Sequence, residues 1–87
     1  MRGSVYNLKS LLEQRGFVCV EQSANKSDTF SFDYLVLYKD TKVVSIMCSL
    51  NGITVVANNG KSADKIIINC KEHISYDDYQ KVLFYLN

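Results

Sequence analysis

The chain has 87 residues, of which 47% are hydrophobic, and a formal net charge of +1 from ten Lys and Arg against nine Asp and Glu. This length and composition predict one small folded domain over residues 1–87 and exclude an intrinsically disordered chain. The balanced charge lacks the basic excess of proteins that bind nucleic acid non-specifically. The longest apolar runs are far shorter than the roughly 18 residues of a membrane-spanning helix.

The first predicted element is a helix from Val5 to about Arg15. Ser4 is its predicted N-cap, because a serine oxygen can accept a hydrogen bond from an unpaired amide of the first turn. Gly16 is the predicted residue that ends it in the left-handed conformation. Apolar residues recur at helical spacing and form one stripe, namely Val5, Leu8, Leu11 and Leu12.

Two short segments follow. Phe17–Glu21 is predicted to be a strand, with its absence as the alternative. Gln22–Thr29 is rich in Ser, Asn, Lys and Asp, so we expect a polar loop there that is available for contacts.

The segment from Phe30 to Ala57 predicts three consecutive strands, because its runs are rich in aromatic and β-branched residues. Lys39–Lys42 reads as a hairpin loop. Asn51-Gly52 predicts a second hairpin through a type I′ turn, in which both residues take a positive φ. Links this short join antiparallel neighbours, so we expect a meander.

The rest of the chain predicts one strand and one helix. Asn58–Asp64 is a polar loop, and its Gly-Lys-Ser is not a phosphate loop because Val55 stands where the first glycine would be. Lys65–Cys70 is a predicted strand contacted on both faces, because three isoleucines stand in a row. Ser75 is predicted to cap a final helix that docks on the fold through a stripe of Tyr76, Tyr79, Val82, Leu83 and Leu86.

The predicted fold class is therefore α+β, with an antiparallel meander of four to five strands between an N-terminal and a C-terminal helix, in the order α-β-β-β-β-β-α. Both faces of the meander carry apolar side chains, whereas a sheet with one wet face should alternate with polar ones. If both helices pack on one side, an apolar face remains, and such a patch marks an interaction site. If one helix covers each face, nothing remains. The candidate interaction surface is Tyr34, Val36, Tyr38, Lys39, Lys42, Val43 and Met47.

An aromatic stripe runs along the first strand of the meander, made of Phe30, Phe32, Tyr34 and Tyr38. Such a stripe can stack the bases of single-stranded nucleic acid, with Lys26, Lys39, Lys42 and Lys61 near the phosphates. The alternative is that the stripe packs under the helices as core. The near-zero net charge favours the core interpretation.

The three cysteines, Cys19, Cys48 and Cys70, are odd in number and widely spaced, which argues against a disulfide framework. Without an apolar leader segment, this pattern predicts a cytoplasmic protein. His73 lies three residues after Cys70, which is half of a zinc site at most, so we expect no metal and no cofactor. The same pair is the sole Cys-His combination for nucleophilic catalysis, and only Asp77 is near in sequence to orient the histidine.

The first half of the chain resembles the opening of the restriction-endonuclease-like core: a helix, a Gly-aromatic pair, a strand, a polar loop and then an aspartate in a strand. The resemblance places Asp33 at the metal-binding aspartate. That family then has an acidic residue or Gln, one residue, and Lys on the next strand, where this chain has Met47, Cys48 and Ser49. It also has a helix where Asn51-Gly52 makes a hairpin. The resemblance therefore implies, at most, a catalytically degenerate relative.

These observations predict a non-enzymatic binding protein that acts by protein–protein contact, with self-association into a homodimer as a further expectation. Compact proline-free chains rich in Asn, Lys and Ile are typical of phage or mobile-element accessory proteins that inhibit or redirect a host protein. Two alternatives stay open. One is a single-stranded nucleic-acid-binding module that uses the sheet aromatics and loop lysines, and the other is the degenerate endonuclease-like domain.

Overall fold

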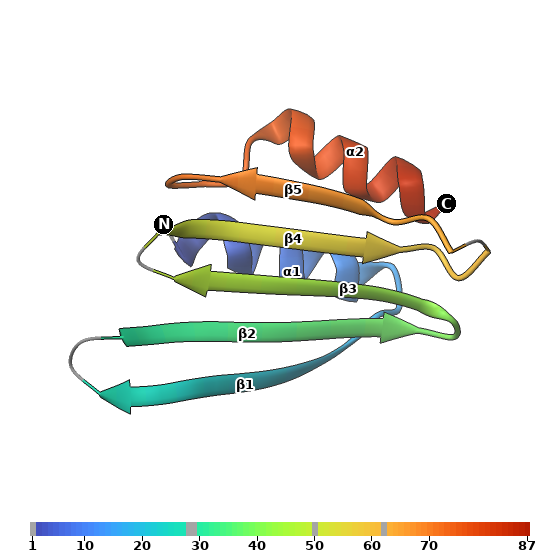
Figure 1. Cartoon of the computed structure of the whole chain (residues 1–87). Coiled ribbons are helices and arrows are strands. Elements are labelled where there is room, and N and C mark those ends of the chain that lie inside the picture. The colour runs from blue at the N-terminus through green and yellow to red at the C-terminus, as the bar shows by residue number, and fades with distance from the viewer. Residues whose placement is uncertain (1, 28–29, 50, 62) are drawn as a thin grey trace.

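The computed structural model describes the backbone of residues 2–27, 30–49, 51–61 and 63–87, and the side chains of residues 3–20, 34–49, 51–61 and 63–87. In chain order the elements are α1 (Arg2–Gln14), β1 (Val18–Ser27), β2 (Phe30–Lys39), β3 (Lys42–Ser49), β4 (Gly52–Asn58), β5 (Ile66–Cys70) and α2 (Tyr76–Leu86) (Figure 1). The α+β fold and the α-β-β-β-β-β-α order predicted from the sequence are confirmed.

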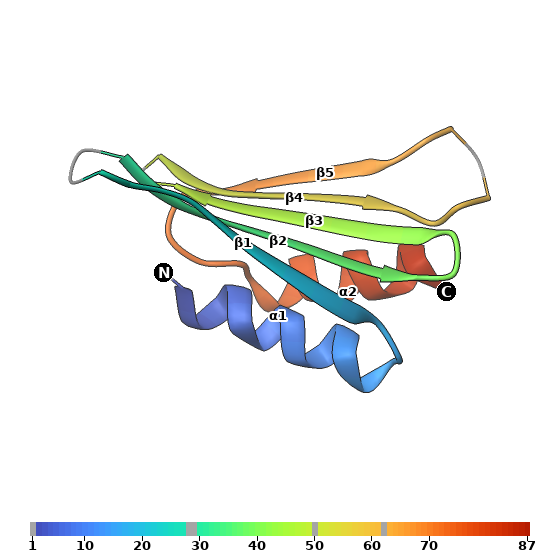
Figure 2. The same cartoon turned by 90° about the horizontal axis from the view of Figure 1, so that it is seen from below.

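The strands form one five-stranded antiparallel sheet in the order β1-β2-β3-β4-β5. Each strand pairs with its neighbour in sequence, as in Leu35 opposite Ile46 and Val55 opposite Ile68. Both helices lie on the same side of the sheet (Figure 2). The alternative with one helix on each face is therefore wrong, and the other face of the sheet has no helix over it.

The core lies between the two helices and the sheet. It is one cluster of buried apolar side chains, to which α1 contributes Val5, Leu8 and Leu12 and α2 contributes Val82, Leu83 and Leu86. The strands contribute every second residue: Leu35, Leu37, Val44, Ile46, Cys48, Ile53, Val55 and Ala57. Because successive strand residues point to opposite faces, the residues between them point away from the helices.

The N-terminal helix begins earlier than predicted. It starts at Arg2, so Ser4 lies inside it and is not its N-cap. The Ser4 hydroxyl instead accepts a hydrogen bond from the backbone amide of Ile74 at 2.9 Å, and its carbonyl accepts one from the Tyr79 hydroxyl at 2.9 Å. Ser4 thus ties α1 to α2. Gly16 ends the helix as predicted, with a φ of +94°.

The region predicted to be the polar loop Gln22–Thr29 is mostly strand. β1 runs to Ser27 and pairs with β2 through Ala24 opposite Phe32, and an irregularity in the pairing follows before Ser27. Polar composition alone misled the prediction, because a hairpin arm is held by backbone hydrogen bonds whatever its side chains.

Both predicted hairpins exist, but one turn differs from its prediction. β3 and β4 pair up to Ser49 opposite Gly52, so Gly52 already belongs to β4 and is not a turn residue between the two strands. The predicted turn centred on Asn51-Gly52 is therefore wrong, and Gly52 has a φ of +135° at the start of the strand. Gly52 is needed for another reason, because a Cβ there would lie 2.3 Å from the carbonyl oxygen of Cys70.

At the C-terminal end, Ser75 caps α2 as predicted and accepts a hydrogen bond from the Asp78 amide at 3.2 Å. Two other expectations are wrong. Ile67 is exposed, so β5 is not contacted on both faces, and Tyr76 is exposed and does not dock. Ile67 lies on the face of the sheet opposite the helices, and Tyr76 is the first residue of α2 with its side chain exposed.

Candidate functional site

The uncovered side of the sheet, which we call the open face, carries a continuous apolar surface. Its exposed apolar side chains are between 37% and 55% accessible and comprise Val18, Val20, Tyr38, Val43, Met47 and Ile67. Tyr34, Val36 and Val56 are half-buried among them. Strand pairing joins these residues in rows across the sheet, such as Val20, Val36, Ser45, Val56 and Ile67.

The strands carry no charged side chain on the open face. Among their described residues on this face, the polar ones are Ser45, Ser49, Thr54, Asn58 and Asn69, and the nearest lysines along β5 are Lys65 directly before it and Lys71 directly after it. The Thr54 hydroxyl donates to the Asn69 side-chain oxygen at 3.0 Å. A monomer that exposes so large an apolar area without charges is unusual, and such areas commonly mark interaction sites.

Five of the seven residues of the predicted interaction surface lie together on this face: Tyr34, Val36, Tyr38, Val43 and Met47. Lys39 and Lys42 do not, because their positions in the pleat point to the helix side. The Lys39 ammonium donates to the carbonyl oxygen of Arg15 at 2.8 Å, at the end of α1. Lys42 lines a small hollow with Phe17, Leu83 and Leu86.

The aromatic stripe does not pack under the helices, so the core interpretation is wrong for Tyr34 and Tyr38. Tyr38 is exposed and Tyr34 half-buried, both on the open face. Phe30, Phe32 and Lys26 lie outside the residues whose side chains are described. The Lys61 ammonium is directed to the end of α2, where it lies 3.5 Å from the backbone oxygen of Asn87.

The predicted loop Asn58–Asp64 is braced at several points. The Asn58 side chain accepts a hydrogen bond from the Gly60 amide at 2.7 Å, and the Asn59 side chain accepts one from the Lys61 amide at 2.9 Å. The Tyr85 hydroxyl donates to the Asp64 carbonyl at 2.6 Å, which ties the loop to α2. These hydrogen bonds restrain the loop, which is typical of a structural connection between strands and not of a flexible loop that adapts to a partner.

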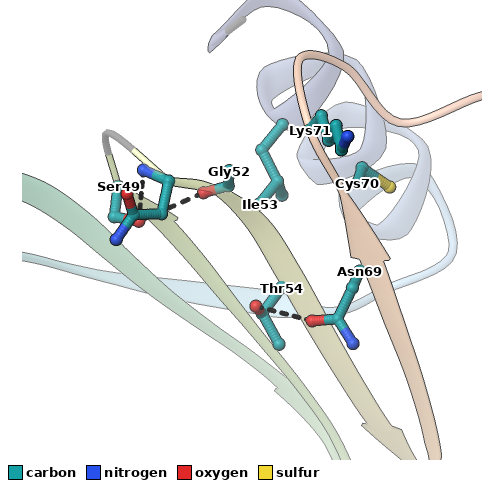
Figure 3. A pocket seen from close by; sticks show the side chains of 8 residues that line it. Ser49, Gly52, Ile53, Thr54, Asn69, Cys70 and Lys71 are labelled. Atoms are coloured by element: carbon teal, nitrogen blue, oxygen red, sulfur yellow. Dashed lines mark hydrogen bonds between the residues drawn. The ribbon is translucent and has the colours of Figure 1, made fainter.

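A shallow pocket of about 410 Å³ lies where the open face ends at the β3–β4 turn. Figure 3 shows Thr54 facing Asn69 on adjacent strands, with Ser49 hydrogen-bonded at the turn and Lys71 at the rim. The lining holds one amine, one thiol and neutral polar groups, with no carboxylate and no imidazole. Among the described residues, Ser49, Thr54 and Cys70 bond to Gly52, Asn69 and Asp78, and none bonds to the Lys71 amine, which is the contact by which a base would activate a nucleophile.

The thiol in that pocket belongs to Cys70, which the sequence paired with His73. In the structure the Cys70 sulfur lies 3.5 Å from Asp78 Oδ2, and no hydrogen bond joins Cys70 to His73 among the described residues. Burial raises the pKa of the Cys70 thiol, and the hydrogen bond to the Asp78 carboxylate and its negative charge raise it further. A nucleophilic cysteine needs a lowered pKa, so this environment opposes thiolate chemistry.

The metal site implied by the endonuclease-like resemblance, with Asp33 as its ligand, finds no support in the described residues. Within the described residues, no group of three or more His, Cys, Asp and Glu side chains could hold a metal ion. Asp33 pairs through its backbone with Ser23 and Cys48, and its side chain lies outside the described set. β3 continues directly into β4, where the endonuclease-like family has a helix.

Sequence reasoning missed one feature, a groove between β5 and α2. It is lined by Ile66, Ile67, Ile68, Lys81, Phe84 and Tyr85, and it has a volume of about 580 Å³. Phe84 is 82% exposed beside it. The signal was present in the sequence, because Phe84 lies off the predicted apolar stripe of its helix.

No protein-family model, curated protein or solved structure matches this chain. In the part of the chain that the structure describes, neither helix has the length and apolar character needed to cross a membrane.

Proposed function

We propose that this protein is a non-enzymatic binding protein that acts through protein–protein contact, with the open face as its binding surface. The observation that carries the proposal is the continuous apolar, uncharged face on the side of the sheet opposite both helices. The fold already has a complete core without it. These side chains therefore contribute little to the stability of the isolated chain and are available to a partner.

The chemistry of the open face defines the partner. Burying apolar area is favourable by about 25 cal/mol per Å², and Tyr and Met side chains are enriched in protein interfaces. A charged partner surface would lose its hydration over the strands without gaining a counter-charge, because their described open-face side chains are all uncharged. The partner should therefore present an apolar patch with few charges.

The proposed biological role is to inhibit or redirect a host protein in the cytoplasm, as accessory proteins of phages and mobile elements do. The small size and the composition of the chain support this role. A flat open face can block a partner's own contact surface without any reaction. The raised pKa of the Cys70 thiol supports a function without covalent chemistry.

A single-stranded nucleic acid is the second candidate ligand, because Tyr34 and Tyr38 lie on an accessible face where bases could stack. It is less well supported than a protein. Lys39 contacts the end of α1 and Lys42 lies on the helix side, so neither is beside the tyrosines to neutralise phosphates.

Affinity capture from native host cells with charge-introducing variants tests the proposal. The double variant Tyr38→Asp/Met47→Asp places two carboxylates on the open face. The control Tyr6→Asp/Tyr76→Asp places the same charges at exposed positions on the two helices. Quantitative mass spectrometry should show a partner that the wild type and the control retain and the open-face variant loses.

Equal recovery of the partner by both double variants would contradict the proposal. Recovery of nucleic acid in place of protein, with affinity falling linearly on a logarithmic salt scale, would favour the second candidate. Circular dichroism of both variants should show unchanged folding, because the substituted side chains are exposed.

A further inference from the structure

The second surface of interest is the β5 edge of the sheet. β5 pairs with β4 on one side and has no strand on the other. Its outward backbone groups are donors and acceptors spaced for another strand. The edge is short and apolar, with Ile66, Ile67 and Ile68 in a row, and α2 runs beside it (Figure 1).

The groove along this edge is lined by apolar side chains that do not belong to the buried core. α2 already buries Val82, Leu83 and Leu86 in the core. Phe84 points elsewhere, is 82% exposed, and lines the groove with the three isoleucines. A large aromatic side chain beside an unpaired strand edge is suited to a partner that adds a strand to the sheet.

We propose that the partner at this edge is a second copy of the same chain. In this arrangement β5 pairs antiparallel with β5 of the second copy, and the two five-stranded sheets become one continuous sheet. The two α2 helices then lie side by side beneath the seam, with Phe84 of both copies between them. The two-fold symmetry closes the assembly at two copies.

The sequence of the edge is self-complementary about Ile67. A two-fold axis perpendicular to the sheet keeps both open faces on one side, so each residue must face one from the same side of the pleat. With Ile67 opposite Ile67 of the second copy, Ile66 faces Ile68, and Lys65 faces Asn69. Every isoleucine of the run then meets another isoleucine.

Charge opposes one of the two neighbouring registers. A shift of one residue in each chain would set Lys65 opposite Lys71 of the second copy, and like charges directly opposite are destabilising. In the Ile67-centred register, Lys81 instead lies near the C-terminal turn of α2 of the second copy. That turn carries the negative end of the helix dipole, so the contact is favourable.

The available area suits a weak dimer. β5 and α2 are each about 17 Å long at standard rise per residue. A contact of that length, about 20 Å deep, covers roughly 350 Å² of each copy, which is the size of a weak, transient interface. α2 contacts both β4 and β5, so its position allows the usual helix spacing of about 8–10 Å across the seam.

Sedimentation velocity over a wide concentration range tests the dimer. The wild type should change from monomer to dimer with a dissociation constant on the order of micromolar. Phe84→Glu should weaken association at least about tenfold, because it buries carboxylates at the seam. Tyr76→Glu, an exposed aromatic at the start of the same helix, and Tyr38→Asp on the open face should leave the dimer unchanged.

A monomer at all concentrations up to about 1 mM would overturn the proposal, since a specific interface of this size should associate below that limit. So would a dimer that Tyr38→Asp disrupts and Phe84→Glu does not, because that dimer would use the open face. The result is distinguishable from a failure of the proposed function, because Phe84 lies outside the open face and Tyr38 lies outside the seam, although the two surfaces meet at Ile67.

Disulfide cross-linking tests the register in a Cys19→Ser/Cys70→Ser background, where Cys48 is buried. Paired residues in antiparallel strands have Cα atoms about 4.5–5.5 Å apart, within the range of a disulfide. Ile67→Cys should therefore form a covalent dimer with oxidised glutathione. Asn69→Cys on the same face should not, because its counterpart would be about 13 Å away. Equal or faster cross-linking of Asn69→Cys would overturn the proposed register.

Discussion

The two faces of the sheet are built from the same five strands, yet they differ in what they contact. On the helix side, Leu37, Ile46 and Val55 are fully buried. On the open face, their sequence neighbours Tyr38 and Met47 are 44% and 41% exposed. Alternation along each strand thus places one apolar set in the core and a second apolar set outside it.

This difference separates core formation from the proposed binding role within one sheet. The helix-side set closes the core together with α1 and α2. The open-face set is apolar without being needed for that core, and in a monomer such a surface costs solubility. The proposed binding function gives a reason for hydrophobic residues at these positions.

The largest expected effect is a difference in stability between substitutions at two adjacent residues of β3, one on each face of the sheet. Ile46→Ala should lower the free energy of unfolding by about 2–5 kcal/mol, because it leaves a cavity in a closely packed core. Met47→Ala should change it by less than about 0.5 kcal/mol, because the side chain is exposed. Urea unfolding followed by circular dichroism measures both, and similar losses would show that the open face is buried in solution.

A second pair of substitutions extends the comparison to the backbone. Gly52→Ala should cost at least about 2 kcal/mol, because its φ of +135° disfavours a side chain and a Cβ would meet the Cys70 carbonyl oxygen. Gly3→Ala should instead stabilise the chain by about 0.5–1 kcal/mol, because it lies in α1 with nothing within 4 Å of its Cβ position. Thermal unfolding of the two variants should shift in opposite directions, and a shift in the same direction would contradict the turn geometry.

A smaller effect concerns how the helix layer is held. Ser75→Ala should cost about 1 kcal/mol, because the Asp78 amide loses its cap. Ser75→Asp is the matched control, since an aspartate can cap the same amide and should restore most of the stability. Urea unfolding compares the three proteins, and equal stability of Ser75→Ala and wild type would show that the cap does not contribute.

The smallest expected effect is the pH dependence due to Cys70. Its thiol pKa is raised in the folded chain, first by burial and then by Asp78, so the folded state holds the proton more tightly than the unfolded state. The resulting stabilisation is present below the pKa of the unfolded thiol and is lost as pH rises through the folded pKa. The stability advantage of the wild type over Cys70→Ala should therefore shrink between about pH 7 and about pH 10. A constant difference across this range would contradict the assigned environment.

Sequence patterns sufficed for the element order, because the period-2 and period-3.6 signals of β2, β3 and α1 were strong. They also identified the residues that share the open face, since alternation from Tyr34 to Tyr38 and from Val43 to Met47 fixes their side of the sheet. They could not decide which side the helices cover. That choice depends on tertiary packing, which no local pattern records.

The errors have separate physical causes. Ser4 was read as a cap from its residue type, although its hydroxyl bonds to Ile74, 70 positions away. The polar side chains of Gln22–Thr29 predict a loop, although residues 22–27 belong to β1, because strand pairing is a backbone property. Lys39 and Lys42 were grouped with the tyrosines by closeness in sequence, although adjacent strand residues point to opposite faces.

The most direct test of the central claim is carbene footprinting of the open face. Photochemical labelling should modify Met47 and Tyr38 strongly in the purified protein and weakly in a native host extract that contains the partner. Tyr6 and Tyr76, which are exposed on the helices, should be labelled equally in both. Protection confined to the open face is the result we predict. Equal labelling of Met47 and Tyr38 in the two samples would contradict the assignment of this face as the binding surface.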